Sequence, residues 1–274
     1  MANRIVRRAA REAPEDVVDL SGLATDKDRL GDRPRSKKRV EIGRLKKSVT
    51  ALTRYDRKAI LVRYSSPYSA GLEYTLHARH FYLILQRKWL DDTIMNAYYV
   101  LLSDKLHREK NHNLILLHTY VYSILSTKVL NTETDGLHVY FDKRARFYLC
   151  AVLVNGNHWI SVLVDVVEAI AYVYDSLHLD SATYADKIMD GLRGILRVHR
   201  KIAGMTCVDP NALPIRYIEK APKQKNNRDC GVYALAFAHA QVRAVHFCRV
   251  RMGADMESYG RENLAVALQR THVQ

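Results

Sequence analysis

The sequence lacks any apolar stretch long enough to cross a membrane, which takes about 20 consecutive apolar residues. Its longest candidate, residues 159–174, is interrupted by Asp165 and Glu168. The N-terminal residues also lack the apolar central run of a secretory signal. We therefore expect neither a membrane-spanning nor a secreted protein, but one in the cytoplasm or the nucleus with no membrane partner.

Cysteine is scarce: the chain has four, and no two of them form a C-x-x-C pair. Zinc sites usually contain such pairs, and the histidines show no H-E-x-x-H pattern either. We therefore expect no metal and no cofactor. Outside the secretory pathway the thiols stay reduced, so Cys150, Cys207 and Cys248 are expected in the core or at its edge, as small apolar residues.

Charge is strongly unbalanced, since the 274 residues carry a net charge of +14. Residues 1–47 hold fourteen Lys and Arg against eight Asp and Glu, including the cluster RPRSKKR at residues 33–39. The low apolar content of residues 21–47 predicts a disordered basic arm, followed by a folded domain over residues 48–274. Such a cluster is typical of nuclear-localisation signals and of nucleic-acid contacts, and equally of a solvated arm. No pattern indicates an oligomeric state.

Four residues with complementary chemistry stand out. Asp175 follows His158 by seventeen residues, and Gln224 lies six residues before Cys230. A thiolate attacks a carbonyl far better than a thiol does, a histidine can take the thiol proton and return it to the leaving amine, and a carboxylate orients the histidine. The Gln amide and the Cys230 backbone N–H would hold the oxyanion. The set predicts a thiol protease with these four catalytic residues.

Each of the four also has an ordinary structural explanation. His158 borders an apolar segment, and a free cysteine such as Cys230 is usually a buried small residue. Asp175 belongs to a residue type common in turns, and Gln224 lies in a polar loop. Their joint occurrence in this order favours the catalytic interpretation.

The segments around these residues predict where they lie. Three short runs rich in β-branched and aromatic residues predict strands at residues 147–154, 159–164 and 169–174. A hairpin through residues 165–168 would set His158, at the start of one strand, beside Asp175, at the end of the next. Residues 231–247 predict a buried helix with Cys230 at its N-terminus, where the helix dipole favours a thiolate.

Periodicity and capping residues predict the remaining elements. Helices are expected at residues 92–106, 112–130 and 180–203, and a last strand at residues 215–218. Asp91 or Asp92 would cap the first helix, and Asp180 or Ser181 the third. Residues 48–87 are expected to hold a helix or strand, a loop and another element. This mixture predicts an α+β fold.

Three segments resemble the SUMO-protease family, the ubiquitin-like-protein-specific cysteine proteases. They are KWLDDTIMNAYYVLL at residues 88–102, GNHWISVLVDVVEAIAYVYDSL at residues 156–177 and QKNNRDCG at residues 224–231. They match that family's Trp-Leu-Asn-Asp helix start, its His-to-Asp segment and its Gln-to-Cys segment, in the family's order. The resemblance covers about residues 88–248. It implies the papain-like cysteine protease fold, with a central mixed sheet flanked by helices.

The resemblance also implies a substrate. Members of the family clamp the Gly-Gly tail of a ubiquitin-like modifier between two tryptophans, and this chain has only two, Trp89 and Trp159, at the matching places. A slot between flat rings admits residues without side chains, which selects glycine. Asp91 replaces the usual Asn, while Asp92 keeps the acid that contacts a basic modifier surface. Trp89, Asp92 and Trp159 are thus implied to bind substrate, and a SUMO-like modifier and its conjugates are implied as partners.

The sequence leaves three other functions open. A viral or mobile-element maturation protease, similar to the adenovirus endopeptidase, has the same residue order and is often helped by nucleic acid, which suits the basic arm. An acyltransferase on the same scaffold would transfer an acetyl group from acetyl-CoA and hydrolyse no peptide. A non-catalytic module would bind modifiers without an activated thiol.

Overall fold

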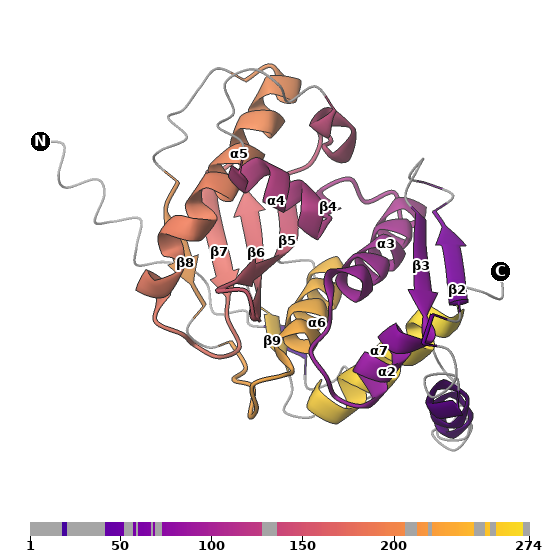
Figure 1. The fold of residues 1–274 in the computed structure, drawn as a ribbon. Helices are drawn as coiled ribbons and strands as arrows, with labels where there is room; N and C mark the ends of the chain where they lie inside the picture. The colour runs from indigo at the N-terminus through magenta and orange to yellow at the C-terminus, as the bar shows by residue number, and fades with distance from the viewer. Residues whose placement is uncertain are drawn as a thin grey trace, which may run out of the picture.

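The computed structural model describes residues 18–20, 42–51, 57–58, 60–66, 68, 73–127, 136–205, 213–218, 221–243, 250–252 and 256–270. Within these ranges the centre of the molecule is a five-stranded sheet in the order β4-β5-β6-β7-β8 (Figure 1). Its strands are β4 (Leu114–Leu117), β5 (Phe147–Val154), β6 (His158–Asp165), β7 (Ile170–Tyr174) and β8 (Ile215–Tyr217). The inner pairs are antiparallel and both outer pairs are parallel, so the sheet is mixed, as predicted.

Strand β6 is the middle of the core. All eight of its residues are buried, which is typical of a strand covered on both faces. Successive side chains point to opposite faces, so Val162 packs on one side while Trp159 and Leu163 pack on the other. The turn from β5 to β6 places Asn155 and Gly156 at φ values of 53° and 74°. Asn and Gly adopt this left-handed region more readily than other residues, which permits the tight hairpin.

Helices cover both faces of the sheet (Figure 1). Helices α4 (Thr119–Thr127) and α5 (Ala185–Ala203) lie on one face, and α3 (Asp92–Arg108) and α6 (Cys230–Arg243) lie on the other. A Cβ atom at Gly191 of α5 would lie 2.5 Å from the ring of Tyr122, so only glycine allows α4 to approach this closely. Two 3-10 helices, η3 (Leu137–Tyr140) and η4 (Ser181–Thr183), complete this region.

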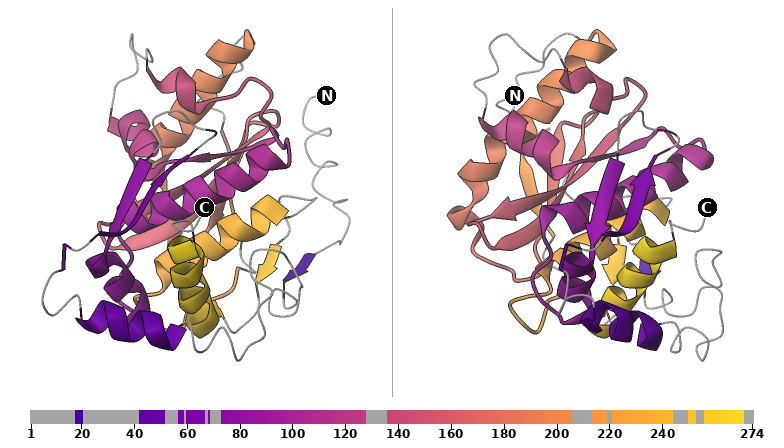
Figure 2. Two further views of the ribbon diagram at one scale, coloured as in Figure 1. Left: turned by 90° about the vertical axis from the view of Figure 1, so that its right-hand side faces the viewer. Right: turned by 45° about the vertical axis from the view of Figure 1, so that its right-hand side comes forward.

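A further layer packs against α3 and α6 (Figure 2). It contains the antiparallel pair β2 (Ile60–Ser65) and β3 (Glu73–His77), followed by α2 (Ala78–Leu85), and the C-terminal helix α7 (Met256–Arg270). A short parallel pair joins β1 (Val18–Leu20) to β9 (Val250–Met252). In the described part of the chain, no helix has the length and apolar character that a bilayer span requires.

The predicted elements nearest the candidate site are confirmed. The three predicted runs correspond to β5, β6 and β7, and the turn between the last two falls at residues 166–169. The helix predicted over residues 231–247 begins at Cys230 and is described to Arg243. The helix predicted over residues 92–106 is α3, and the last predicted strand is β8. Local pattern therefore sufficed where each element is strongly apolar.

The helix predicted over residues 112–130 is wrong in its first part. Leu114–Leu117 form strand β4, which pairs in parallel with β5, and the helix starts only at Thr119. A four-residue apolar run suits a buried strand or a helix, and pairing with a neighbour decides between them. The helix predicted over residues 180–203 begins at Ala185 after a 3-10 turn, and its N-cap is Tyr184 rather than Asp180 or Ser181.

The domain boundary predicted at residue 47 falls inside a helix. Residues 42–51 are helical, and Ile42, Leu45 and Val49 on that helix are buried, the latter two in the core cluster of α3 and α6. The folded part therefore includes residues 42–47 of the predicted arm. Most of the arm, with the basic cluster at residues 33–39, lies outside the described residues, as do Cys207 and Cys248.

Candidate active site

The antiparallel pairing of β6 with β7 brings His158 and Asp175 together. His158 is the first residue of β6 and Asp175 is the first residue after β7, so both lie at the same end of the sheet. The imidazole Nε2 and the carboxylate Oδ1 are 2.6 Å apart, and both side chains are buried. A hydrogen bond of this length between an imidazole and a carboxylate fixes the ring orientation and favours its protonated form.

Four hydrogen bonds hold the carboxylate of Asp175 in place. Besides the bond to His158, its Oδ1 accepts the backbone N–H of Leu177 at 2.8 Å, and its Oδ2 accepts the backbone N–H of Leu179 at 3.0 Å. The hydroxyl of Tyr184 donates to Oδ2 at 3.2 Å. Burial alone would raise the pKa of Asp175, but these donors, led by His158, hold it below its usual value. The carboxylate therefore stays ionised.

Cys230 reaches this pair from the first turn of α6. Helix α6 packs directly on β6, and Ser161 Oγ donates to the Ala234 carbonyl at 3.1 Å, which ties the helix to the strand that begins with His158. Cys230 is the first residue of the helix and is almost completely buried. The first backbone N–H groups of a helix have no partner within it and carry partial positive charge. Cys230 therefore lies at the positive end of the helix dipole.

The charge state of His158 follows from its two neighbours. Burial lowers the pKa of this imidazole, but interactions with the side chains of Asp175 and Cys230 outweigh burial and raise it to about 9. Asp175 occupies Nε2, so Nδ1 is the nitrogen left for the thiol. Nδ1 is buried and has no hydrogen bond of normal geometry. A loose contact between base and nucleophile is common in enzymes without substrate.

Gln224 is anchored to the residue that follows Asp175. Ser176 Oγ donates to Gln224 Oε1 at 2.6 Å, and the Gln224 backbone N–H donates to the Ser176 carbonyl at 2.8 Å. The side-chain Nε2 donates one hydrogen to the carbonyl of Asn226. An amide nitrogen has two hydrogens, so one remains available for an oxyanion. Ser176 and Tyr184, which contact Gln224 and Asp175, are not among the residues predicted from the sequence, because no motif records these contacts.

The two tryptophans are fixed by their indole N–H groups. Trp159 Nε1 donates to the Leu90 carbonyl at 2.8 Å, and Trp89 Nε1 donates to the Asn227 carbonyl at 2.8 Å. Trp159 is 6% exposed and belongs to the core, whereas Trp89 is 51% exposed. A Cβ atom at Gly231 would lie 3.2 Å from Trp159 Cδ1, so Trp159 packs beside the residue after Cys230. Trp89 therefore presents an aromatic surface to solvent next to the 224–230 loop.

Asp91 and Asp92 lie at the start of α3. Asp91 is the N-cap, and its Oδ1 accepts the backbone N–H of Ile94 at 3.0 Å. Asp caps a helix as well as Asn does, so the departure from the family pattern at this position preserves the cap. Its other oxygen lies 3.6 Å from Nε2 of buried His80. Asp92 is exposed at the first helical position and is free to face a partner.

The fold and this site together define a cysteine protease catalytic domain of papain-like architecture. The model of the Ulp1 protease family, C-terminal catalytic domain, matches residues 88–270, and the chain belongs to that family. The match begins where the resemblance in the sequence begins and extends past it to include α7.

A Caenorhabditis elegans protein described as a sentrin-specific protease is 27% identical over 154 residues, which are 54% of this chain and 21% of that protein. This chain thus corresponds to about a fifth of that relative's length.

Solved structures of the same family share the fold. The SUMO protease Ulp1 with its catalytic cysteine oxidised to a sulfenic acid superposes with a TM-score of 0.63 at 15% identity, covering 90% of this chain and 100% of that one. The Chaetomium thermophilum Ulp1-like SUMO protease catalytic domain has a TM-score of 0.58 at 16% identity, covering 84% of this chain and 90% of that one. The C-terminal Ulp1 protease domain in complex with SMT3, the yeast orthologue of SUMO, has a TM-score of 0.58 at 15% identity, covering 90% of this chain and 100% of that one. They confirm the predicted fold class.

Proposed function

We propose that this chain is a cysteine endopeptidase and isopeptidase that cleaves after the C-terminal Gly-Gly of a SUMO-like modifier. The observation that carries the proposal is the 2.6 Å bond between His158 and Asp175, beside a cysteine at a helix N-terminus. Solved structures with the same fold are named as SUMO proteases, which supports a SUMO-like modifier as the substrate. Maturation of precursors and release of modifiers from lysines are the two reactions that follow.

In this proposal each of the four catalytic residues has a separate role. With His158 protonated and Cys230 as thiolate, the sulfur attacks the carbonyl carbon of the terminal glycine and forms a C–S bond. The oxyanion that develops is held by the free hydrogen of Gln224 Nε2 and by the Cys230 backbone N–H. His158 then gives its proton to the leaving amine as the C–N bond breaks. Water, deprotonated by His158, attacks the thioester and releases the modifier carboxylate and the thiolate.

The proposal also assigns roles to Asp175 and to the two tryptophans. Asp175 keeps the ring of His158 in one orientation and stabilises the imidazolium. Trp89 and Trp159 are proposed to border the approach of the modifier tail to Cys230, where their flat rings would admit only a tail without side chains. The exposed carboxylate of Asp92 faces solvent at the start of α3, where it would contact a basic surface of the modifier.

A panel of modifier probes tests this proposal. Each probe carries SUMO, ubiquitin or another modifier with an electrophile in place of its terminal carboxyl group. The wild-type chain should capture the SUMO probes covalently, whereas the Cys230→Ala variant should capture none. Capture of ubiquitin alone would contradict the SUMO preference. Acetyl transfer from acetyl-CoA without hydrolysis would point to the acyltransferase alternative instead.

The location and the nucleic-acid partner form a separate part of the proposal. The basic cluster at residues 33–39 supports a nuclear or cytoplasmic protein whose arm contacts nucleic acid through phosphates. Removing the cluster should weaken binding to a DNA duplex and reduce its dependence on salt. Unchanged binding would remove this part of the proposal and leave the protease assignment as it is.

A further inference from the structure

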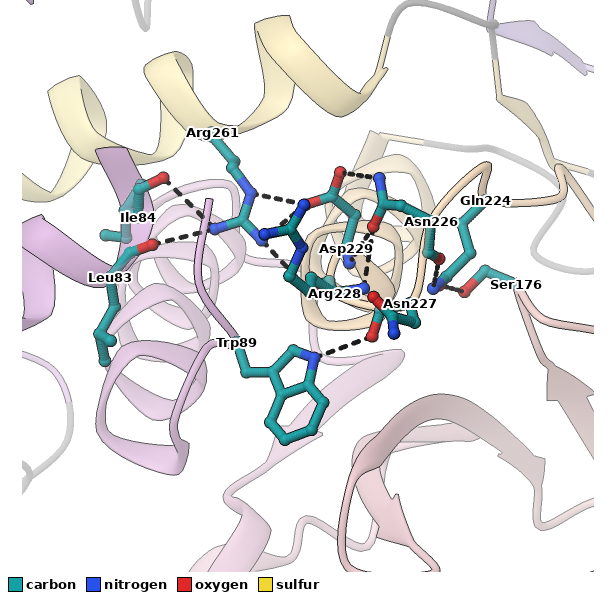
Figure 3. A network of polar contacts seen from close by, with 10 residues as sticks. All are labelled: Leu83, Ile84, Trp89, Ser176, Gln224, Asn226, Asn227, Arg228, Asp229 and Arg261. Atoms are coloured by element: carbon teal, nitrogen blue, oxygen red, sulfur yellow. Dashed lines mark hydrogen bonds and ion pairs between the residues drawn. The ribbon is translucent and has the colours of Figure 1, made fainter. Parts of the chain in front are cut away.

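Arg261 of the C-terminal helix α7 forms a buried ion pair with Asp229, the residue immediately before Cys230 (Figure 3). Arg261 Nε donates to Asp229 Oδ1 at 2.6 Å, and Nη2 lies 2.6 Å from the same oxygen. The side chains are 2% and 1% exposed. Because desolvation offsets most of the attraction within a buried pair, the pair is a poor source of stability, and its value lies in what it holds in place.

The same guanidinium holds a second segment. Its Nη1 donates to the carbonyls of Leu83 and Ile84, at 3.1 Å and 3.3 Å, in the last turn of α2. Each carbonyl also accepts a backbone N–H from just beyond the helix, Leu83 from Lys88 at 2.8 Å and Ile84 from Arg87 at 3.3 Å. A cation at this C-terminal end of α2 also suits the helix dipole. Trp89 follows Ile84 by five residues. Arg261 thus positions the end of α2, from which the chain leads to the exposed tryptophan.

The two segments held by Arg261 also touch each other. Arg261 Nη2 donates to the carbonyl of Arg228 at 3.0 Å, and the neighbouring carbonyl of Asn227 accepts the indole N–H of Trp89 at 2.8 Å. Figure 3 shows this closed ring of contacts, which runs from Arg261 through the end of α2 to Trp89 and back through the 224–230 loop.

Asn226 makes the 224–230 loop rigid from within. Its Nδ2 donates to Asp229 Oδ2 at 2.8 Å, and its Oδ1 accepts the backbone N–H groups of Arg228 and Asp229 at 2.8 Å and 3.0 Å. Its carbonyl accepts from Gln224 Nε2. A displacement of Asp229 would therefore also displace the side-chain amide of Gln224, because Asn226 contacts both residues.

We propose that Arg261 is a positioning residue that holds Gln224, Cys230 and Trp89 in one arrangement and compensates the charge of Asp229, the residue before Cys230. The proposal rests on the proposed function. A carboxylate without its cation, next to the thiol, would disfavour the thiolate. His158 and Arg261 both interact electrostatically with the Cys230 side chain, and Asp229 directly precedes Cys230 in the sequence. Loss of Arg261 would therefore leave the buried Asp229 carboxylate without its cation, one residue from the nucleophile.

The electrostatics of Arg261 agree with this arrangement. Burial holds the pKa of the guanidinium below its usual value, although attraction to Asp229 opposes this effect; repulsion from Arg87 lowers the pKa further, and attraction to Cys230 is the smallest contribution and raises it. Cys230 and Arg261 therefore influence each other, although they lie on different helices.

Three variants separate the charge from the position: Arg261→Met, Arg261→Lys and Asp229→Asn/Arg261→Met. Alkylation of Cys230 by iodoacetamide is followed across pH by mass spectrometry of its peptide, and kcat and KM are measured on a SUMO-fluorophore substrate. Arg193→Met is the control: it removes an arginine of α5 that pairs with Asp190, far from Cys230 in the sequence, and this variant should resemble wild type.

Arg261→Met should move the alkylation midpoint upward by about one pH unit or more and lower kcat by about tenfold or more, with a smaller change in KM. The double variant should restore the midpoint but not kcat, because the bonds to α2 and Arg228 remain lost. Arg261→Lys keeps the charge without the planar fork, so its midpoint should stay normal while kcat falls.

Wild-type midpoint and kcat in a folded Arg261→Met protein would overturn the proposal. If that variant does not fold, wild-type kcat in both Arg261→Lys and the double variant would overturn it equally. Alkylation needs no modifier, so it tests Arg261 even if the wild-type chain cleaves no SUMO substrate. Failure of the proposed function and failure of this inference are therefore distinguishable.

Discussion

Ser176 donates its hydroxyl hydrogen to Gln224 Oε1 at 2.6 Å, across 48 positions of sequence. Ser176 directly follows Asp175, so the carboxylate that orients His158 and the amide assigned to the oxyanion are held by neighbouring residues of one segment. The base and the oxyanion donor thus share a support at the end of β7. This link leads to the first prediction.

Ser176→Ala should lower kcat by about tenfold and leave KM nearly unchanged. Without the hydroxyl, Gln224 can rotate and its Nε2 no longer points reliably at the oxyanion, which exists only along the reaction path. The effect should be smaller than the 10²- to 10³-fold typical of deleting an oxyanion donor. Steady-state kinetics on a SUMO-fluorophore substrate measure it. Ser126→Ala on α4, which loses only a local bond within its helix, serves as the control.

Cys230→Ala should abolish turnover and preserve modifier binding. The alanine removes the nucleophile while the helix and the loop keep their contacts, because Cys230 contributes little beyond its sulfur to the packing. Titration calorimetry with mature SUMO and a cleavage assay together check this. Loss of binding as well as turnover would indicate that the variant had damaged the fold rather than the chemistry.

The stability of the fold should fall as pH rises through about 9. The pKa of His158 in the folded chain is about 9, above the ordinary 6.5, so its protonated form stabilises the fold fully below pH 6.5 and the contribution disappears above pH 9. A shift of this size corresponds to about 3 kcal/mol. Urea unfolding of wild type and His158→Gln at pH 6, 8 and 9.5 measures it, and the gap between the two proteins should narrow at the highest pH.

The two tryptophans should respond differently to truncation. Trp89→Ala should leave the melting temperature nearly unchanged and raise KM, because Trp89 is largely exposed. Trp159→Ala should cost about 3–5 kcal/mol of unfolding free energy, because its ring lies in the core. Thermal unfolding and kinetics on tails ending in Gly-Gly and Gly-Ala test both. If the Trp89→Ala variant discriminates between the two tails as strongly as wild type does, Trp89 does not line the tail channel.

Much of the site could be predicted from the sequence because the relevant segments are strongly patterned. The apolar runs of β5, β6 and β7 leave one hairpin arrangement, which places His158 at the same end as Asp175. The helix that begins at Cys230 is apolar almost throughout. By contrast, the run Leu114–Leu117 fits a helix or a strand, and only its partner β5 decided the outcome.

The sequence by itself predicted the chemistry of this protein: which four groups could act on a carbonyl, in what order they come, and which short segments carry them. Tertiary structure alone decided what holds those groups, since Ser176, Tyr184 and Arg261 belong to no motif and meet their partners from distant parts of the chain. The physical reason is that periodicity and capping act over a few residues. Contacts such as Arg261 to Asp229 form only when separate helices pack, and no local pattern encodes them.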